Sequence, residues 1–126
     1  MNVALWIVQI LLAAVFLVHG VFLLAPPASM IELLNASMSP AFRIFLGLAE
    51  VAAAIGITIP GFIRVQPWLV PAAAAGLIVV MASATVFHVV RGELTSAAIT
   101  VILLAMASVI SYMRWRVHPN AARTLA

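Results

Sequence analysis

Long apolar runs, separated by short polar or proline-containing stretches, dominate the chain. Each run is close to the roughly 20 residues that an α-helix needs to cross the hydrocarbon core of a bilayer. The pattern predicts membrane-spanning helices at about residues 3–24, 40–59, 67–90 and 94–113. We therefore expect an all-α, four-transmembrane-helix bundle that forms a single domain over residues 1–126.

Serines and prolines mark the predicted helix boundaries. In the linker after the first span, Ser29 and Glu32 have the spacing of a capping box, which predicts a short interfacial helix between helices 1 and 2. Ser39 followed by Pro40 predicts the N-cap and the first residue of the second span. Pro60 predicts the end of that span, because proline cannot donate the backbone hydrogen bond that a helix interior requires.

The composition agrees with a membrane location. The sequence is 67% hydrophobic and 7% charged, and its mean hydropathy is +1.29. A soluble domain would carry about a quarter charged residues, so the chain is predicted to be an integral membrane protein. It contains no cysteine, which excludes disulfides and cysteine-ligated metals within the chain.

The charged residues give a prediction of orientation. The net charge of +3 comes from arginines that lie beside apolar runs, which indicates topology signals and not a nucleic-acid-binding surface. One side of the predicted bundle carries Arg64, Arg114, Arg116 and Arg123, together with Trp6, Trp68 and Trp115, whereas the other side carries Arg43 and Arg91. The positive-inside rule then places both termini in the cytoplasm, with the chain in the cytoplasmic membrane of a bacterium. The segment from residue 114 is expected to be a polar tail that frays at its end.

Glu50 is the most informative position, because a carboxylate within a bilayer is costly and usually faces a protein interior. It lies about ten residues into the second span, which corresponds to a depth of roughly 15 Å. Gly47 and Ala54 share its helix face and would allow close approach of a neighbouring helix. Since Arg43 begins about 10 Å farther out, we expect His19 or a water molecule to be the partner of Glu50.

The remaining polar candidates gather at the same predicted outer end of the bundle. We assign candidate acid–base roles to Glu50, His88 and His19, and ligand-binding roles to Arg43 and Arg91. Each also has a structural interpretation, as a hydrogen-bonded core residue or as an interfacial side chain that extends to the headgroups. His19, His88 and Glu50 could formally ligate a metal, but their estimated depths differ by several ångströms, so no metal site is predicted. Solvated positions are expected for Glu32, Glu93 and His118.

The order of short motifs in the chain resembles that of the DoxX-like family of small four-helix membrane proteins. These motifs are Arg43…Gly47-Leu-Ala-Glu50…Gly56…Pro60, followed by His88-Val-Val-Arg91-Gly-Glu93. The family takes its name from a subunit of a thiosulfate:quinone oxidoreductase, so the resemblance implies a quinone-linked redox subunit. Family members often carry a small-x-x-Lys pattern that closes the first span. This chain has His19-Gly-Val-Phe-Leu-Leu24 there and no lysine.

Three functions remain open on the sequence. The leading hypothesis is a DoxX-like subunit that binds a quinone or another lipophilic small molecule in an outward-facing, polar-headed pocket within a redox complex. The second is a small membrane enzyme that acts on a lipophilic substrate by Glu/His acid–base chemistry. The third is a structural or assembly subunit. The expected partners are the lipid bilayer, further copies of the chain or other membrane subunits, and a lipophilic molecule, with no nucleic acid.

Overall fold

The computed structural model describes residues 2–123, and over that range the protein is all-α, without a β-strand. The α-helices α1 to α5 comprise Asn2–Leu24, Ile31–Ser37, Pro40–Ile63, Leu69–Val90 and Leu94–Tyr112. A 3₁₀ turn, Ala28–Met30, precedes α2, and a π-helical turn, η2 (Met113–Val117), follows α5. Helices α1, α3, α4 and α5 (with η2) are long and apolar enough to span a membrane. The predicted fold class is confirmed.

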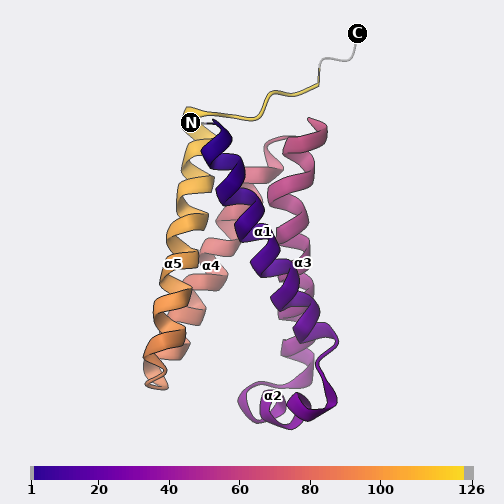
Figure 1. Ribbon diagram of the computed structural model, residues 1–126, viewed down its shortest axis with the longest axis vertical. Helices are drawn as coiled ribbons and strands as arrows, with labels where there is room; N and C mark the ends of the chain where they lie inside the picture. Colours follow the sequence, from indigo (N-terminus) through magenta and orange to yellow (C-terminus); the bar gives the residue numbers. More distant parts are fainter. Residues whose placement is uncertain (1, 124–126) are drawn as a thin grey trace.

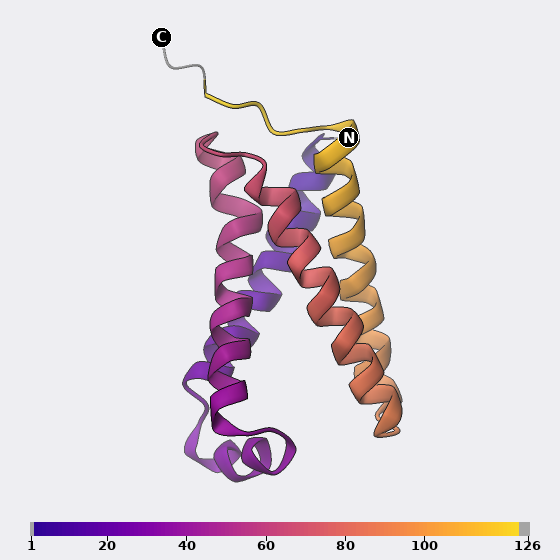
Figure 2. The ribbon, with the colours of Figure 1, turned by 180° about the vertical axis from the view of Figure 1, so that it is seen from behind.

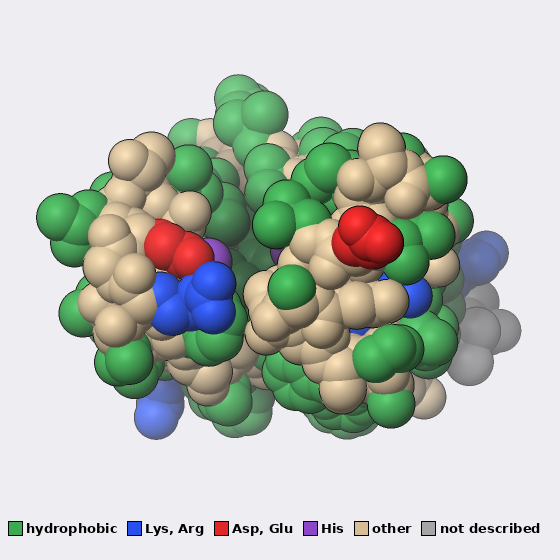
Figure 3. Space-filling view, turned by 90° about the horizontal axis from the view of Figure 1, so that it is seen from below, with side chains coloured by type: hydrophobic (Ala, Val, Ile, Leu, Met, Phe, Trp, Pro, Cys, Tyr) green, Lys and Arg blue, Asp and Glu red, His purple; other side chains and the backbone are tan. Residues whose placement is uncertain are grey.

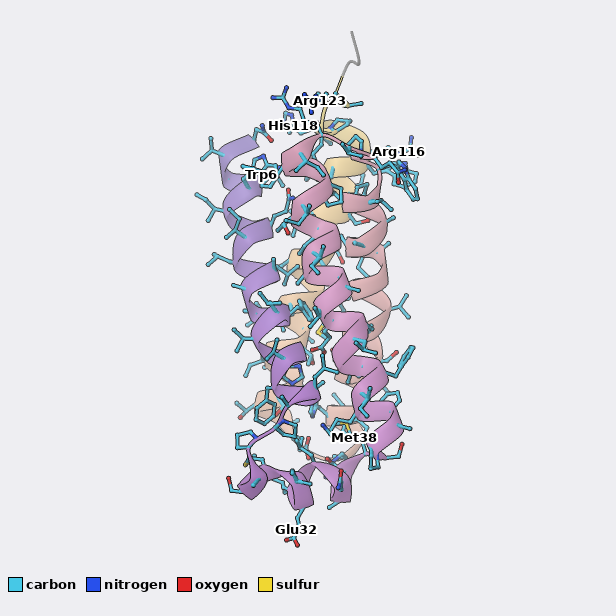
Figure 4. All side chains as sticks on the ribbon, turned by 90° about the vertical axis from the view of Figure 1, so that its right-hand side faces the viewer. Trp6, Glu32, Met38, Arg116, His118 and Arg123 are labelled. Carbon is cyan, nitrogen blue, oxygen red and sulfur yellow. The ribbon has the colours of Figure 1, made fainter. Side chains whose placement is uncertain are left out.

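The spanning helices form two pairs that diverge from one end of the molecule. Helix α1 packs mainly against α3, and α4 packs mainly against α5. The pairs meet at the end that holds the N-terminus and separate toward the end where α2 lies (Figures 1 and 2). Trp6 and Arg116 mark the first end, and Glu32 and Met38 mark the second (Figure 4). We call these the closed end and the open end.

The apolar core that joins all four spanning helices occupies the part of the bundle nearer the closed end. It comprises Leu12, Ala13, Phe16, Ala54, Ile57, Val70, Ala74, Leu77, Met81, Ala107 and Ile110. Phe16 is its last member along α1, and Met81 is its last along α4. Beyond these residues, buried positions outside this core include Leu23 of α1, Gly47 of α3 and Ala97 of α5. Among the described residues, the shared core therefore does not extend to the open end.

Glycines hold α1 and α3 together at the open end. A Cβ atom built on Gly47 would lie 2.9 Å from the carbonyl oxygen of Gly20, and one built on Gly20 would lie 2.9 Å from that of Gly47. The two backbones are in contact there, which only residues without a side chain permit. The predicted packing role of Gly47 is confirmed, and Ala54 on the same helix face is also buried.

The helix starts agree with the sequence at one boundary and differ at another. The Ser39 side chain accepts a hydrogen bond from the Phe42 backbone N–H at 3.3 Å, with Pro40 as the first helical residue, so the predicted N-cap of α3 is confirmed. The predicted capping box is wrong. Ser29 lies within the 3₁₀ turn, which delays the start of α2, and Met30 occupies the N-cap position without a side-chain hydrogen bond.

Helix α3 continues through Pro60 and ends at Ile63, four residues beyond the predicted limit of 59. The side-chain amide of Gln9 donates a hydrogen bond of 2.6 Å to the Ile57 carbonyl, in the turn before the proline. The carbonyl that loses its intrahelical donor at Pro60 is that of Gly56, so the Gln9 bond adds an interhelical contact beside the proline and does not replace the lost bond. Helix α3 continues through Pro60 with this contact in the preceding turn.

The loop after α3 and the C-terminal segment also differ from expectation. Helix α4 begins at Leu69 and not at Pro67, because Gln66 adopts a left-handed conformation (φ 47°) and Pro67 lies in the following turn. The predicted polar tail from residue 114 is wrong at its start, since Arg114 is buried in η2. The predicted fraying concerns residues 124–126, which lie outside the described part of the chain.

Candidate functional site

His19 and Glu50 form a buried pair between α1 and α3. The Nδ1 atom of His19 lies 2.6 Å from Oε2 of Glu50, and the Glu50 side chain is 2% exposed. The contact between Gly20 and Gly47 brings the two helices close enough for this bond, because His19 is adjacent to Gly20 and Glu50 is about one turn from Gly47. Of the two partners expected for Glu50, His19 or a water molecule, the structure shows His19.

The His19 ring is also accessible from outside the bundle. Its side chain is 53% exposed and borders a shallow hollow of about 560 Å³, whose other walls are Ala14, Val15, Val18 and Phe22 of α1. Seen from the open end, the molecule is also hollowed between two lobes (Figure 3). The residues around the hollow beside His19 all belong to α1, and we call this hollow the recess. One polar ring therefore lies in an otherwise apolar setting, the arrangement typical of sites for lipophilic ligands.

Arg43 does not contact Glu50. Its Nη1 atom donates a hydrogen bond to the carbonyl of Leu23, in the last turn of α1. Arginines commonly bond the unsatisfied carbonyl groups at a helix C-terminus, where the helix dipole also favours a positive charge. Arg43 therefore ties α3 to the end of α1, and the structure gives it no direct part in the His19–Glu50 pair.

The second cluster lies in the turn between α4 and α5. His88 Nδ1 lies 2.5 Å from Glu93 Oε2, and Arg91 Nε donates to Glu93 Oε1 at 2.8 Å. The Arg91 guanidinium also lies over the Phe87 ring, 5.1 Å from its centroid. The hydrogen bonds from Arg91 and His88 hold the pKa of the Glu93 carboxyl below its ordinary value.

Glu93 is a residue whose role the sequence reasoning missed. It was expected to be solvated, yet it is the acceptor that joins His88 and Arg91. The spacing His88-Val-Val-Arg91-Gly-Glu93 contains the signal, because a tight turn brings residues five apart into contact. The three polar side chains of this turn therefore bond to one another, and the negative charge of Glu93 is paired with the positive charge of Arg91.

The structure does not join the two clusters into one constellation. His19 and Glu50 belong to the α1–α3 pair, whereas His88, Arg91 and Glu93 belong to the α4–α5 pair. Among residues 2–123, no three histidine, cysteine or acidic residues lie close enough together to hold a metal ion. The two polar clusters thus lie on separate helix pairs, and of these residues only His19 lines the recess.

A third polar network, at the closed end, was also missed. Arg114 is 3% exposed and donates from Nε to Gln9 Oε1 at 2.5 Å and from Nη1 to Asn2 Oδ1 at 2.7 Å. Its guanidinium lies over the Trp6 ring, 5.1 Å from the centroid. Gln9 forms interhelical hydrogen bonds both to Arg114 and to α3. Nothing in the position of Arg114 after the apolar run indicated its burial.

Comparison with known families supports the interpretation of the sequence. The model of the DoxX-like family matches residues 7–110, which is most of the chain. The chain belongs to the DoxX-like family. It is accordingly a multi-pass membrane protein whose helices contact the lipid bilayer. Comparisons with curated proteins and with solved structures found no match.

In this DoxX-like protein, the family match includes both polar clusters of the open end. His19, Glu50, His88 and Glu93 all lie within residues 7–110, whereas Arg114 lies beyond them. The closed-end network therefore extends outside the part of the chain that the family shares.

Proposed function

We propose that this DoxX-like protein binds a quinone or a similar lipophilic molecule in the recess at the open end, as a subunit of a membrane redox complex. The observation that carries the proposal is the half-exposed His19 ring, hydrogen-bonded to the buried Glu50 and bordered by apolar side chains. Such a setting suits a ligand with a polar head and an apolar tail, because few polar groups then orient a mostly apolar molecule.

The His19–Glu50 pair has the right chemistry for the head of a quinone. With Nδ1 engaged by Glu50, Nε2 is the ring nitrogen that can reach a ligand in the recess. A protonated His19 would donate from Nε2 to a quinone carbonyl oxygen, and the buried carboxylate of Glu50 would stabilise the imidazolium. Reduction of the quinone by electrons from a partner subunit would then draw that proton to the oxygen.

His88 and Arg91 are further donors, which belong to the other helix pair and do not line the recess. In the unliganded arrangement both are bonded to Glu93, so a ligand would have to compete with that carboxylate for them. We therefore assign them a secondary role, in which Arg91 or His88 bonds the far end of a quinone head after leaving Glu93. Arg43 contributes by holding the α1–α3 pair in place.

The proposal includes a location in the bacterial cytoplasmic membrane with both termini cytoplasmic, which places the open end on the outer side. The closed end carries Trp6, Arg116 and Arg123 (Figure 4), as the positive-inside rule favours for a cytoplasmic side. Reporter proteins active only in the cytoplasm or only in the periplasm, fused after the last residue, test this. Activity of the periplasmic reporter alone would show that the orientation is the opposite of the one proposed.

A small acid–base enzyme is the second candidate, and the His19–Glu50 hydrogen bond supports it, because a histidine oriented by a carboxylate is a common general base. Such an enzyme would turn over a lipophilic substrate without a partner subunit. Purification in mild detergent separates the candidates. Turnover by the isolated chain favours the enzyme, whereas co-purification of redox subunits or further copies of the chain favours the complex or an assembly role.

The direct test of the proposal is a binding titration with a short-chain quinone in mild detergent. Wild-type protein should bind, and His19→Ala and Glu50→Gln should each weaken binding by about tenfold or more, as expected for loss of a charge-assisted hydrogen bond. His118→Ala, which removes a histidine from the closed end, is the matched control and should leave binding unchanged. Equal affinity in all four proteins would contradict the proposal.

A further inference from the structure

The closed end contains a second cavity, of about 830 Å³, which lies between the start of α1, the end of α3 and the segment after η2. Its apolar walls include Trp6, Ile10 and Phe62, and its polar lining includes Arg114 and Asn120. Among the described residues that line it there is no carboxylate. The cavity thus presents hydrogen-bond donors and a positive charge within an apolar wall.

The Arg114 guanidinium reaches this cavity with one nitrogen unused. Its Nε and Nη1 atoms are bonded to Gln9, Asn2 and the His118 carbonyl, but its buried Nη2 atom has no hydrogen-bond partner among residues 2–123. An unbonded buried donor on a charged group is costly, and such a group usually meets an acceptor that completes the site. Because the guanidinium is planar, the hydrogen bonds of Nε and Nη1 also fix the direction of the Nη2 atom.

Asn120 supplies a second unused donor in the same cavity. Its Nδ2 atom is buried and likewise lacks a partner within the described part of the chain. A Cβ atom on Gly61 would lie 2.7 Å from Nδ2, so the absence of a side chain at residue 61 allows Asn120 to lie against α3. A backbone hydrogen bond of 2.8 Å from Arg123 to the Arg64 carbonyl holds this segment over the end of the helix.

The two unused donors, Arg114 Nη2 and Asn120 Nδ2, together with the positive charge of the guanidinium, suit a ligand with anionic oxygen atoms. Arginine and amide N–H groups are well suited to the oxygen atoms of a phosphate, and the guanidinium can present its nitrogens to more than one of them. The exposed Ile10 and Phe62 side chains continue the cavity wall along the lipid-facing surface. Trp6 lies at the same end, where aromatic residues mark the level of the headgroups (Figure 4).

We propose that this cavity binds the phosphate headgroup of an anionic membrane phospholipid. Arg114 Nη2 and Asn120 Nδ2 donate to the phosphate oxygens, and the acyl chains lie along the surface that Ile10 and Phe62 form. The lipid satisfies the two buried donors and thereby completes the network that joins α1, α3 and η2. This site is separate from the recess at the open end and does not depend on the function proposed for it.

The test uses the full chain in mild detergent and three additives, each titrated separately: phosphatidylglycerol, phosphatidylcholine and inorganic phosphate. Native mass spectrometry and the shift in melting temperature report binding. Phosphatidylglycerol should bind and raise the melting temperature, phosphatidylcholine should do so more weakly, and inorganic phosphate should have no effect at the same concentration. An equal effect of inorganic phosphate would assign the site to the free anion and overturn the lipid proposal.

Variants locate the site. Asn120→Leu removes one donor and leaves the bonds of Arg114 to Gln9 and Asn2 in place, so it should fold and bind phosphatidylglycerol about tenfold more weakly. Arg114→Gln should weaken binding further. Arg116→Gln removes an exposed cation from the same end and is the matched control. If Arg116→Gln weakens binding as much as Asn120→Leu, the lipid is held by surface charge and the proposal is wrong.

Discussion

The two ends of the bundle use buried polar groups in different ways. At the closed end, Gln9 and Arg114 connect three helical elements, α1, α3 and η2, through direct hydrogen bonds beside a shared apolar core. At the open end, the bond between His19 and Glu50 and those that Glu93 accepts each stay within one helix pair. The closed end is therefore a fixed scaffold, and within residues 2–123 these bonds do not connect the two helix pairs at the open end.

This difference shows where the molecule can accept a ligand. Binding of a ligand in the recess beside His19 would not require breaking a shared core, because the four-helix core ends at Phe16 and Met81. In a bilayer, apolar association between helices gains little from burial, so the pairs need specific contacts to stay together. The closed end supplies those contacts, and each pair at the open end keeps its own.

The largest expected effect on stability is at the closed end. Arg114→Leu should lower the free energy of unfolding by roughly 2–3 kcal/mol, because Gln9 and Asn2 both lose a charged donor in a buried setting. Circular dichroism during denaturation in mild detergent measures it. The control is Arg116→Leu, an exposed arginine whose replacement should cost no more than about 0.5 kcal/mol. Similar losses in both variants would show that the network does not hold the scaffold.

A paired glycine substitution tests the α1–α3 unit. Gly47→Ala places a Cβ atom 2.9 Å from the Gly20 carbonyl oxygen, so the helices must separate, at a cost of about 1–3 kcal/mol and with loss of the His19–Glu50 bond. Gly76→Ala on α4 meets no atom within 4 Å and should cost nothing. Thermal unfolding and quinone binding should both fall in the first variant alone; identical behaviour of the two would exclude the close approach as the cause.

The fold was largely predictable from sequence, because its signals are local. Apolar run length gave the spans, and Ser39-Pro40 marked a true helix start. The errors lie where a distant group decides the outcome. Helix α3 continues through Pro60, with a hydrogen bond from Gln9 of α1 in the preceding turn. Arg114 is buried with side-chain partners on α1, and Gln9 precedes it by 105 residues.

The candidate site was predictable only in part. Helix geometry and depth excluded Arg43 as the partner of Glu50 and left His19 or a water molecule, of which the structure shows His19. The division of the polar residues into two clusters did not follow, because depth alone cannot distinguish neighbouring helix pairs at the same level. The pairing of Glu93 with His88 and Arg91 depends on the geometry of the tight turn. A carboxylate at a turn was expected to be solvated, so this pairing was not predicted.

A smaller effect is expected for the His19–Glu50 bond itself. Glu50→Gln keeps a hydrogen-bonding side chain of the same size, so its cost should be about 1 kcal/mol or less, as is usual for bonds between membrane helices. A double-mutant cycle with His19→Gln should give a coupling energy of similar size. Additive effects in the thermal unfolding of the two variants would contradict the direct contact.

The smallest expected effect is the pH dependence of the α4–α5 turn. Because the folded-state pKa of Glu93 is lowered by Arg91 and His88, its carboxylate stabilises the fold above the ordinary carboxyl pKa, and this contribution is lost as the pH falls through the folded-state value. The difference in melting temperature between wild type and Glu93→Gln should therefore shrink from neutral pH into the acid range. A constant difference would mean that the turn does not depend on the ionised carboxylate.

The central claim is that a lipophilic molecule with a polar head binds at the open end beside His19. Photoaffinity labelling with a quinone analogue, followed by mass mapping, tests it most directly. We expect labels on the α1 segment that contains Val15, Val18 and Phe22, and we expect excess unlabelled quinone to remove them, with no such labelling in His19→Ala. Labels spread over the lipid-facing surface of all four spanning helices, unaffected by competition, would contradict the account.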